Sequence, residues 1–175
     1  MSRGVFIGRF QPFHNGHLYA IKKIFESEDE VIIMIGSAQE SFTLKNPLTT
    51  GERIEIIREV LKNLDLIDKS IIVPIPDIFE NLVWPARILE YAPKFNRVYS
   101  GNELVLMLFE RFGIETVRIE HINRGEFQGR IIREKIIKGE QWDYLVPKVV
   151  YEKLKEFDFE NRIRRLTKHY GRGDV

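Results

Sequence analysis

The chain has 175 residues, of which 43% are hydrophobic and 30% charged, a balance typical of a single folded globular domain. Its formal net charge of +1 gives no general attraction to nucleic acid, and the absence of cysteine excludes disulfides, thiolate metal sites and cysteine nucleophiles. The first residues lack the apolar stretch of a signal peptide, and no apolar run approaches the roughly 20 residues of a membrane span. We therefore expect a cytoplasmic protein without a membrane or nucleic-acid partner.

Short apolar runs alternate with segments of helical periodicity through most of the chain. The runs predict strands at 5–10, 31–35, 70–75, 97–100 and 116–119. The periodic segments predict helices through 18–25, 49–61, 83–91 and 105–109. Thr49, with Glu52 three positions later, has the sequence signature of a capping box at the start of the second helix.

This alternation predicts an α/β fold. Strands that are apolar on both faces and separated by helices favour a parallel sheet covered on both sides. After about residue 129 the pattern is only helical, which predicts a C-terminal helical part over 129–170 behind a core over 4–128. We see no repeat or Pro/Gly/Ser-rich linker and expect one domain over 1–175. Ligands of such sheets bind beyond the carboxyl ends of the strands, so polar residues there are site candidates.

The segment that follows the first strand, GRFQPFHNGHL at 8–18, has the strongest signal for a site. His14 and His17 flank Gly16 at the start of a helix, and Arg9 lies just before them. A helix N-terminus presents unpaired N–H groups and a partial positive charge, so these side chains would complete an anion site. A lone histidine here would be read as a cap or a core residue, but two of the chain's four histidines in one turn favour a phosphate site.

This segment also resembles a known family. His14-Asn15-Gly16-His17 resembles the His/Thr-x-Gly-His signature of the nucleotidyltransferase superfamily, and the whole of 8–18 resembles the archaeal type of nicotinamide-mononucleotide (NMN) adenylyltransferase. The resemblance covers about 4–155, with several motifs in order. It implies a Rossmann-like fold, ATP and NMN as substrates, NAD as product, Mg²⁺ held chiefly by phosphates and water, and a homo-oligomer, commonly a hexamer.

The resemblance also implies roles for individual residues. Adenylyl transfer needs positioning and electrostatic stabilisation rather than a protein nucleophile. The expected triphosphate and catalytic residues are Arg9, His14, His17, Lys45 and Arg133. The other expected ATP-binding residues are Gly8, Phe10, Gln11, Gly16, Gly101, Asn102 and Gly129. The expected NMN-binding residues are Ser37, Ile78, Asn81, Trp84 and Asn123. No residue is expected to bind a metal directly.

Several of these assignments have a structural alternative on the residues alone. The loop with Lys45 could be an ordinary surface loop, and relatives often carry Arg at that position. Trp84 is a core aromatic by its pattern and a nicotinamide-stacking residue by the resemblance. Asn102 is a good helix cap and would also meet the adenosine. Arg53, early in its helix, is the least expected phosphate ligand.

The chain departs from the family near 128–133. Relatives usually have Ser-Gly-Thr-x-x-Arg, whereas this chain has Gln128, Gly129 and Arg130 before Arg133, so two hydroxyl donors are lost and a cation is gained. Two alternative functions stay open: transfer to another acceptor, such as phosphopantetheine or flavin mononucleotide, which the pocket around Trp84 would discriminate, and a module that senses NAD or ATP without turnover, for which this departure is the only support. The basic run at 162–172 is interpreted as a solvated helix face rather than a nucleic-acid patch.

Overall fold

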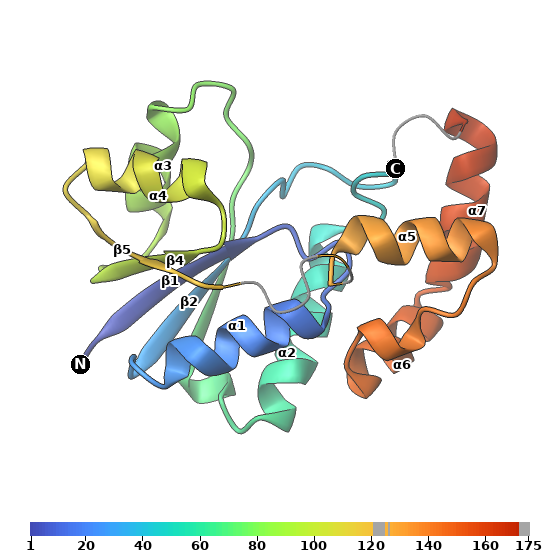
Figure 1. The fold of residues 1–175 in the computed structure, drawn as a ribbon, viewed down its shortest axis with the longest axis horizontal. Helices are drawn as coiled ribbons and strands as arrows, with labels where there is room; N and C mark the ends of the chain where they lie inside the picture. The colour runs from blue at the N-terminus through green and yellow to red at the C-terminus, as the bar shows by residue number, and fades with distance from the viewer. Residues whose placement is uncertain (121–124, 126, 172–175) are drawn as a thin grey trace.

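A parallel sheet in the order β3–β2–β1–β4–β5 forms the centre of the protein, and helices cover both of its faces (Figure 1). The computed structural model describes residues 1–120, 125 and 127–171. The strands are β1 (Arg3–Gly8), β2 (Glu30–Ile35), β3 (Ser70–Pro74), β4 (Arg97–Ser100) and β5 (Glu115–Arg118). The helices are α1 (Asn15–Phe25), α2 (Thr50–Asn63), α3 (Val83–Tyr91), α4 (Glu103–Arg111), α5 (Gly129–Lys138), α6 (Lys148–Glu156) and α7 (Phe159–Tyr170), with short 3₁₀ turns at Ile67–Lys69 and Asp143–Leu145.

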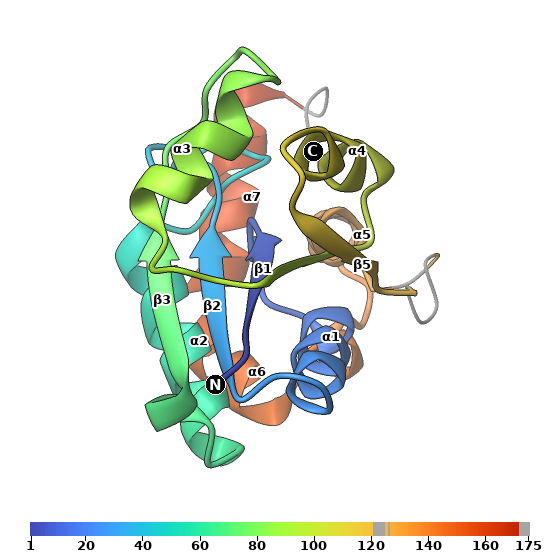
Figure 2. The same cartoon turned by 90° about the vertical axis from the view of Figure 1, so that its left-hand side faces the viewer.

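The strand order reverses at β1, which pairs with β2 on one side and β4 on the other. Such a reversal opens a crevice at the carboxyl ends of the two central strands, because the following helices leave toward opposite faces. In Figure 2, α1 and α2 lie on one side of the sheet and α3 and α4 on the other. Helices α5–α7 pack beyond the carboxyl ends of the strands in Figure 1. The predicted Rossmann-like fold with a C-terminal helical part is confirmed.

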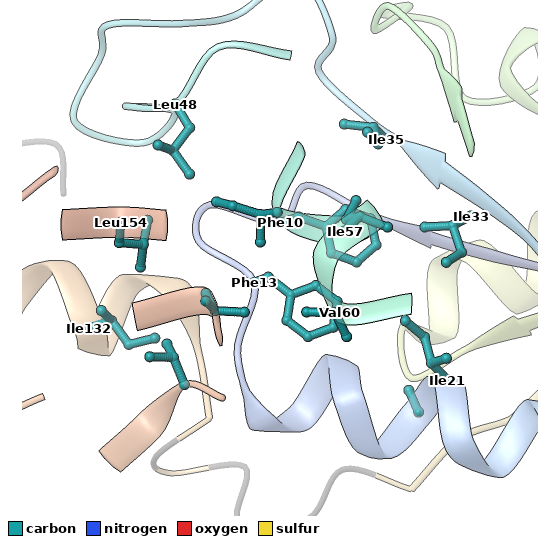
Figure 3. Close-up of a cluster of buried hydrophobic side chains, with 14 of the residues drawn as sticks. Phe10, Phe13, Ile21, Ile33, Ile35, Leu48, Ile57, Val60, Ile132 and Leu154 are labelled. Carbon is teal, nitrogen blue, oxygen red and sulfur yellow. The ribbon is translucent and has the colours of Figure 1, made fainter. Parts of the chain in front are cut away.

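Alternating residues of the strands divide the core into two clusters. On β2, Ile33 and Ile35 face the cluster shared with α1, α2 and the C-terminal helices, whereas Ile32 and Met34 face the cluster under α3 and α4. Figure 3 shows Phe10 and Phe13 of the turn after β1 between the β2 isoleucines and residues of the C-terminal helices. This packing fixes the turn that carries the two histidines.

The helix and strand bounds differ from the prediction by small amounts. β4 and α3 match the expected bounds, and the capping box is confirmed: the Glu52 N–H donates to Thr49 Oγ1 at 3.2 Å, and the Thr49 N–H donates to Glu52 Oε2 at 2.8 Å. The expectation that the first strand extends to Phe10 is wrong. Pairing with β2 stops at Gly8, and Phe10 has a φ of 53°, which is incompatible with an extended strand. No helix in the described part of the chain is long and apolar enough to cross a bilayer.

Candidate active site

A cavity of about 660 Å³ opens at the point where the strand order reverses. Its walls come from the turn after β1, the first turns of α1 and α5, and the end of β4. The structure therefore brings together most of the residues predicted for the triphosphate and the rest of ATP. The predicted residues that line this cavity are Arg9, Phe10, Gln11, His14, Gly16, His17, Gly101, Asn102, Gly129 and Arg133.

His14 and His17 form a stacked pair at the N-terminus of α1. Their ring centroids are 3.6 Å apart and the planes are inclined by 21°. The His14 backbone N–H donates to Nδ1 of His17 at 3.2 Å. Because Nδ1 accepts this hydrogen bond, a neutral His17 ring carries its proton on Nε2, where it can act as a donor.

Aromatic side chains hold the His17 ring in place. Its centroid lies 4.6 Å from that of Phe10 and 5.3 Å from that of Phe13, and both phenylalanines are fully buried. Phe10 reaches this position only because its backbone adopts the left-handed conformation, which is costly for a residue other than glycine. Contacts within the protein thus fix the orientation of the His17 imidazole.

Arg133 connects α5 to the turn after β1. Its side chain is 3% exposed, and its Nη1 donates to the carbonyl oxygen of Gln11. Burial lowers the pKa of Arg133 to about 10, and the nearby Arg9 contributes to the decrease, so the guanidinium stays charged at neutral pH. Its Nε has no hydrogen-bond partner among the described residues, which leaves a buried donor at the edge of the cavity.

Gly129 permits this close approach of α5. A Cβ at position 129 would lie 2.5 Å from the Gln11 carbonyl oxygen, well inside van der Waals contact. The Gln11 side chain is occupied elsewhere, because it exchanges two hydrogen bonds of 2.9 Å with the backbone of Leu48. Gln11 therefore fixes the floor of the cavity, and its carbonyl anchors Arg133.

Two smaller residues also border the turn after β1. A Cβ at Gly16 would approach His14 Nδ1 to 3.0 Å, so glycine leaves room for the stacked imidazoles. A Cβ at Gly8 would approach the Phe10 ring to 2.9 Å; Gly8 itself does not line the cavity.

At the end of β4, Asn102 caps α4 by accepting from the Leu104 N–H at 3.0 Å, as predicted for its structural role. Gly101 precedes it in the cavity wall.

Cationic groups outnumber acidic ones in the wall of this cavity. Arg9 is exposed there, and no carboxylate of the described residues lies within ion-pair distance of it. Arg130 also lines the cavity and pairs with Glu134 one turn later on α5. The acidic side chains in the wall are Glu103 and Glu120. The arrangement suits a polyanionic ligand.

A second cavity, of about 560 Å³, lies on the other side of Arg9. It contains Ser37 and Lys45, and Tyr170 of α7 borders it as well. Ser37 has a φ of 51°, and its backbone N–H donates to Asp77 Oδ1 at 3.1 Å. Arg9 lines both cavities, so the predicted cations Arg9 and Lys45 are within reach of one extended ligand.

Arg53 has a structural role that the sequence did not indicate. This fully buried guanidinium donates to the carbonyl oxygens of Arg9, Gly36 and Ser37 at 3.0, 2.8 and 3.0 Å. It thereby joins the carboxyl ends of β1 and β2. Burial lowers the pKa of Arg53 to about 10, partly offset by Asp77. The Arg53 guanidinium donates to backbone carbonyl oxygens, so its role is to hold the strand ends that carry the site.

Among the described residues predicted for NMN, Ser37 lines a cavity, whereas Ile78, Asn81 and Trp84 line neither. Trp84 is half-buried at the start of α3 and packs in a T-shaped contact on Phe109, with ring centroids 5.7 Å apart. Ile78 and Asn81 lie in the segment between β3 and α3, where Asn81 is exposed. Asn123 lies outside the described residues. No cluster of three or more potential His, Asp or Glu metal ligands occurs in the described ranges.

Comparison with known proteins identifies the family of this chain. The family model described as cytidylyltransferase-like matches residues 5–169. A nicotinamide-nucleotide adenylyltransferase of Methanococcus aeolicus is 48% identical over 165 residues, which cover 94% of this chain and 95% of that protein. One from Saccharolobus solfataricus is 42% identical over 168 residues, covering 95% of this chain and 98% of that protein.

A solved structure supports the fold. The bifunctional NMN adenylyltransferase/ADP ribose pyrophosphatase of Francisella tularensis matches with a TM-score of 0.70 at 21% identity, covering 96% of this chain. The match covers 56% of that longer chain. With a family match over nearly the whole sequence and close archaeal relatives, the chain belongs to the cytidylyltransferase-like family and, within it, to the archaeal nicotinamide-nucleotide adenylyltransferases.

Proposed function

We infer that this chain transfers the adenylyl group of ATP to nicotinamide mononucleotide, forming NAD and releasing pyrophosphate. The observation that carries this inference is the near-complete coverage of relatives named for the activity, at 48% identity for the Methanococcus aeolicus protein. The cation-lined cavity at the reversal of the strand order supplies the chemistry that the reaction needs.

In the proposed reaction, a 5′-phosphate oxygen of NMN attacks the α-phosphorus of ATP. The new P–O bond forms as the bond from the α-phosphorus to the bridging oxygen breaks, and pyrophosphate takes the electron pair. Negative charge grows on the non-bridging and leaving oxygens, so fixed donors lower the barrier. We assign to His17 a hydrogen bond donated from Nε2, a role supported by the hydrogen bond that its Nδ1 accepts from the His14 N–H. No proton transfer from the protein is required.

The remaining cations are assigned to the triphosphate. Arg133 and His14 border the same cavity as His17, and Arg9 lines both this cavity and the one that holds Lys45. Mg²⁺, which the family implies, would neutralise phosphate charge in this reaction. The acidic residues in the cavity wall are Glu103 and Glu120, a donor set that suits an ion held by phosphate oxygens and water.

The nicotinamide end of NMN is assigned to the start of α3. Trp84 offers an indole for stacking on the electron-poor ring, and Asn81 offers an amide for its carboxamide. Trp84→Ala should raise KM for NMN roughly tenfold, equivalent to the loss of about one stacking contact, and change KM for ATP less. Phe109→Leu is the control, because it removes the packing partner of Trp84 and leaves the indole. A larger effect of Trp84→Ala on ATP than on NMN would contradict the assignment.

Two other functions are the alternatives to this proposal. An enzyme acting on another acceptor, such as phosphopantetheine or flavin mononucleotide, would use the same phosphate site with a different pocket near Trp84. A sensor that binds nucleotide without turnover is suggested by Gln128 and Arg130, which stand where the family resemblance implies hydroxyl residues.

One assay separates these functions. The purified chain is incubated with ATP, Mg²⁺ and each acceptor, including nicotinic acid mononucleotide, and both pyrophosphate and the dinucleotide product are measured. We expect NAD and pyrophosphate in equal amounts, with NMN preferred over phosphopantetheine and flavin mononucleotide. Binding of ATP without pyrophosphate release would indicate the sensor, and turnover confined to another acceptor would indicate the first alternative. A cytoplasmic location is part of the proposal and is tested by cell fractionation.

A further inference from the structure

The loop between β2 and α2, residues 36–49, runs toward helix α7 (Figure 1). Arg162 of α7 makes a two-pronged ion pair with Glu52 at the start of α2: Nη1 and Nη2 each lie 2.7 Å from a different carboxylate oxygen. Both side chains are largely shielded, at 16% and 17% exposure. Paired geometry of this kind fixes orientation as well as distance.

Arg162 also contacts the loop directly. Its Nη1 donates to the Pro47 carbonyl oxygen at 3.2 Å, and its guanidinium lies 4.7 Å from the centroid of the Phe42 ring. Phe42 itself has a φ of 55°. One side chain of α7 therefore touches the loop on both sides of Lys45 in the sequence, at positions 42 and 47.

Both ends of the same loop have further anchors. Arg53 of α2 donates to the carbonyl oxygens of Gly36 and Ser37 at its start, and the side chain of Gln11, in the turn after β1, binds the Leu48 backbone at its end. Between these anchors, Lys45 is exposed in the second cavity, and Tyr170 near the end of α7 borders that cavity too. The long flexible stem of a lysine fixes its ammonium poorly, so the backbone beneath it must be held.

We propose that α7 is a working part of the active site, in which Arg162 is a positioning residue that holds the loop so that Lys45 meets the phosphates of ATP. This inference rests on the proposed function, in which Lys45 binds the triphosphate. Arg162 belongs to the basic run near the C-terminus and touches neither substrate in the proposed function, so its role is indirect.

The test measures KM and kcat of the full chain for ATP and NMN in four variants: Arg162→Gln, Lys45→Ala, the double variant, and Arg164→Gln. Arg164 is the matched control, because it lies on the same helix and pairs with Glu160 on the surface, where it is half exposed. We expect Arg162→Gln to raise KM for ATP roughly five- to tenfold, as for loss of one charged contact, with KM for NMN unchanged. Arg164→Gln should behave as the wild type.

The double variant distinguishes positioning from general stability. If Arg162 acts through Lys45, Arg162→Gln raises KM for ATP no further in the Lys45→Ala background. An equal increase in both backgrounds, or no change of KM in Arg162→Gln, overturns the inference. Should Arg162→Gln fail to fold, Arg162→Lys is used instead, because it keeps the charge without the paired geometry. A KM for ATP above that of the wild type but below that of Lys45→Ala is then expected, and a wild-type KM overturns the inference. Failure of the proposed function is distinct, because the wild type itself would then form no NAD.

Discussion

At the scale of single residues, the turn after β1 joins structural and chemical tasks in the same side chains. Phe10 and Phe13 fill the core and also form the walls around the His17 ring. Gln11 binds Leu48 with its side chain and Arg133 with its carbonyl oxygen. A substitution here is expected to change activity through geometry even when the replaced residue touches no substrate.

His17→Ala is expected to lower kcat by roughly 10²-fold or more, the usual effect of removing one preorganised donor from a developing charge. The ring packs on buried phenylalanines, so a modest loss of stability should accompany the substitution. Steady-state kinetics are measured well below the unfolding temperature, with thermal unfolding recorded in parallel. A folded variant with wild-type kcat would remove His17 from the reaction.

Gly129→Ala is expected to reduce activity strongly and to destabilise the protein by about 1–3 kcal/mol, the usual range for overpacking. The new methyl would lie 2.5 Å from the Gln11 carbonyl oxygen, so the start of α5 must move and take Arg133 with it. Gly51→Ala is the matched control, because the nearest atom there is 3.9 Å from the added Cβ. Denaturant unfolding and kinetics of the two variants are compared. Equal stability would show that α5 can shift without cost.

At the scale of elements, local sequence determined the helices and strands, and pairing determined where they end. β4 and α3 follow the predicted bounds because turn residues delimit their apolar runs. β1 begins and ends two residues earlier than expected, because the pairing of β1 with β2 runs from Arg3 to Gly8 of β1. The apolar residue Phe10 belongs to the core through a left-handed turn rather than through a strand.

The candidate site was predictable where a motif and a strand end coincide. His14, Gly16 and His17 are close in sequence, and α5, which Arg133 joins to Gln11, brings Gly129 and Arg133 to the same cavity. The role of Arg53 was not predictable, because it depends on a carbonyl 44 residues away. The same holds for Arg162, whose partner Glu52 is 110 residues distant. The interpretation of the whole basic run as solvated is therefore wrong for Arg162, although half-exposed Arg164 fits it.

The capping box of α2 should give the protein a measurable acid sensitivity. Burial raises the pKa of Glu52, but hydrogen bonds from Arg162 and the Thr49 N–H outweigh this effect, so its pKa lies below the usual value. A carboxyl with a lowered pKa stabilises the folded state above its unfolded pKa and loses that contribution as the pH falls through its folded pKa.

Glu52→Gln should therefore lower the free energy of unfolding by about 1–2 kcal/mol at pH 7, a value between those of exposed and buried pairs. The difference from the wild type should shrink as the pH falls below the ordinary glutamate pKa of about 4.3, and disappear once the pH has fallen through the lower pKa of folded Glu52. Urea unfolding of both proteins from pH 7 to pH 3 measures this difference. If the difference in free energy of unfolding between the two proteins stays constant over this pH range, the charge of Glu52 contributes nothing to stability.

At the scale of the whole molecule, the face formed by α3 and α4 is apolar and exposed. Large hydrophobic side chains there include Leu82 at 54% and Met107 at 57% exposure. The other exposed hydrophobic residues in and next to these helices are Phe79, Val83, Leu89, Tyr91, Leu104 and Phe112. Apolar groups gathered in this way mark association surfaces. Figure 1 places this face on the side of the sheet away from α1 and α2.

We expect this face to bind a second copy of the chain, in keeping with the homo-oligomer that the family resemblance implies. Light scattering coupled to gel filtration should give a mass that is a multiple of the 20.7 kDa chain. The double variant Leu104→Glu and Met107→Glu should lower that mass, because a charge buried at an apolar contact is strongly unfavourable. Tyr144→Glu, at a half-exposed position next to the C-terminal helices, should leave the mass unchanged. A wild-type protein with the mass of a single chain would contradict the assignment, and a double variant with undiminished mass would place the contact on another face.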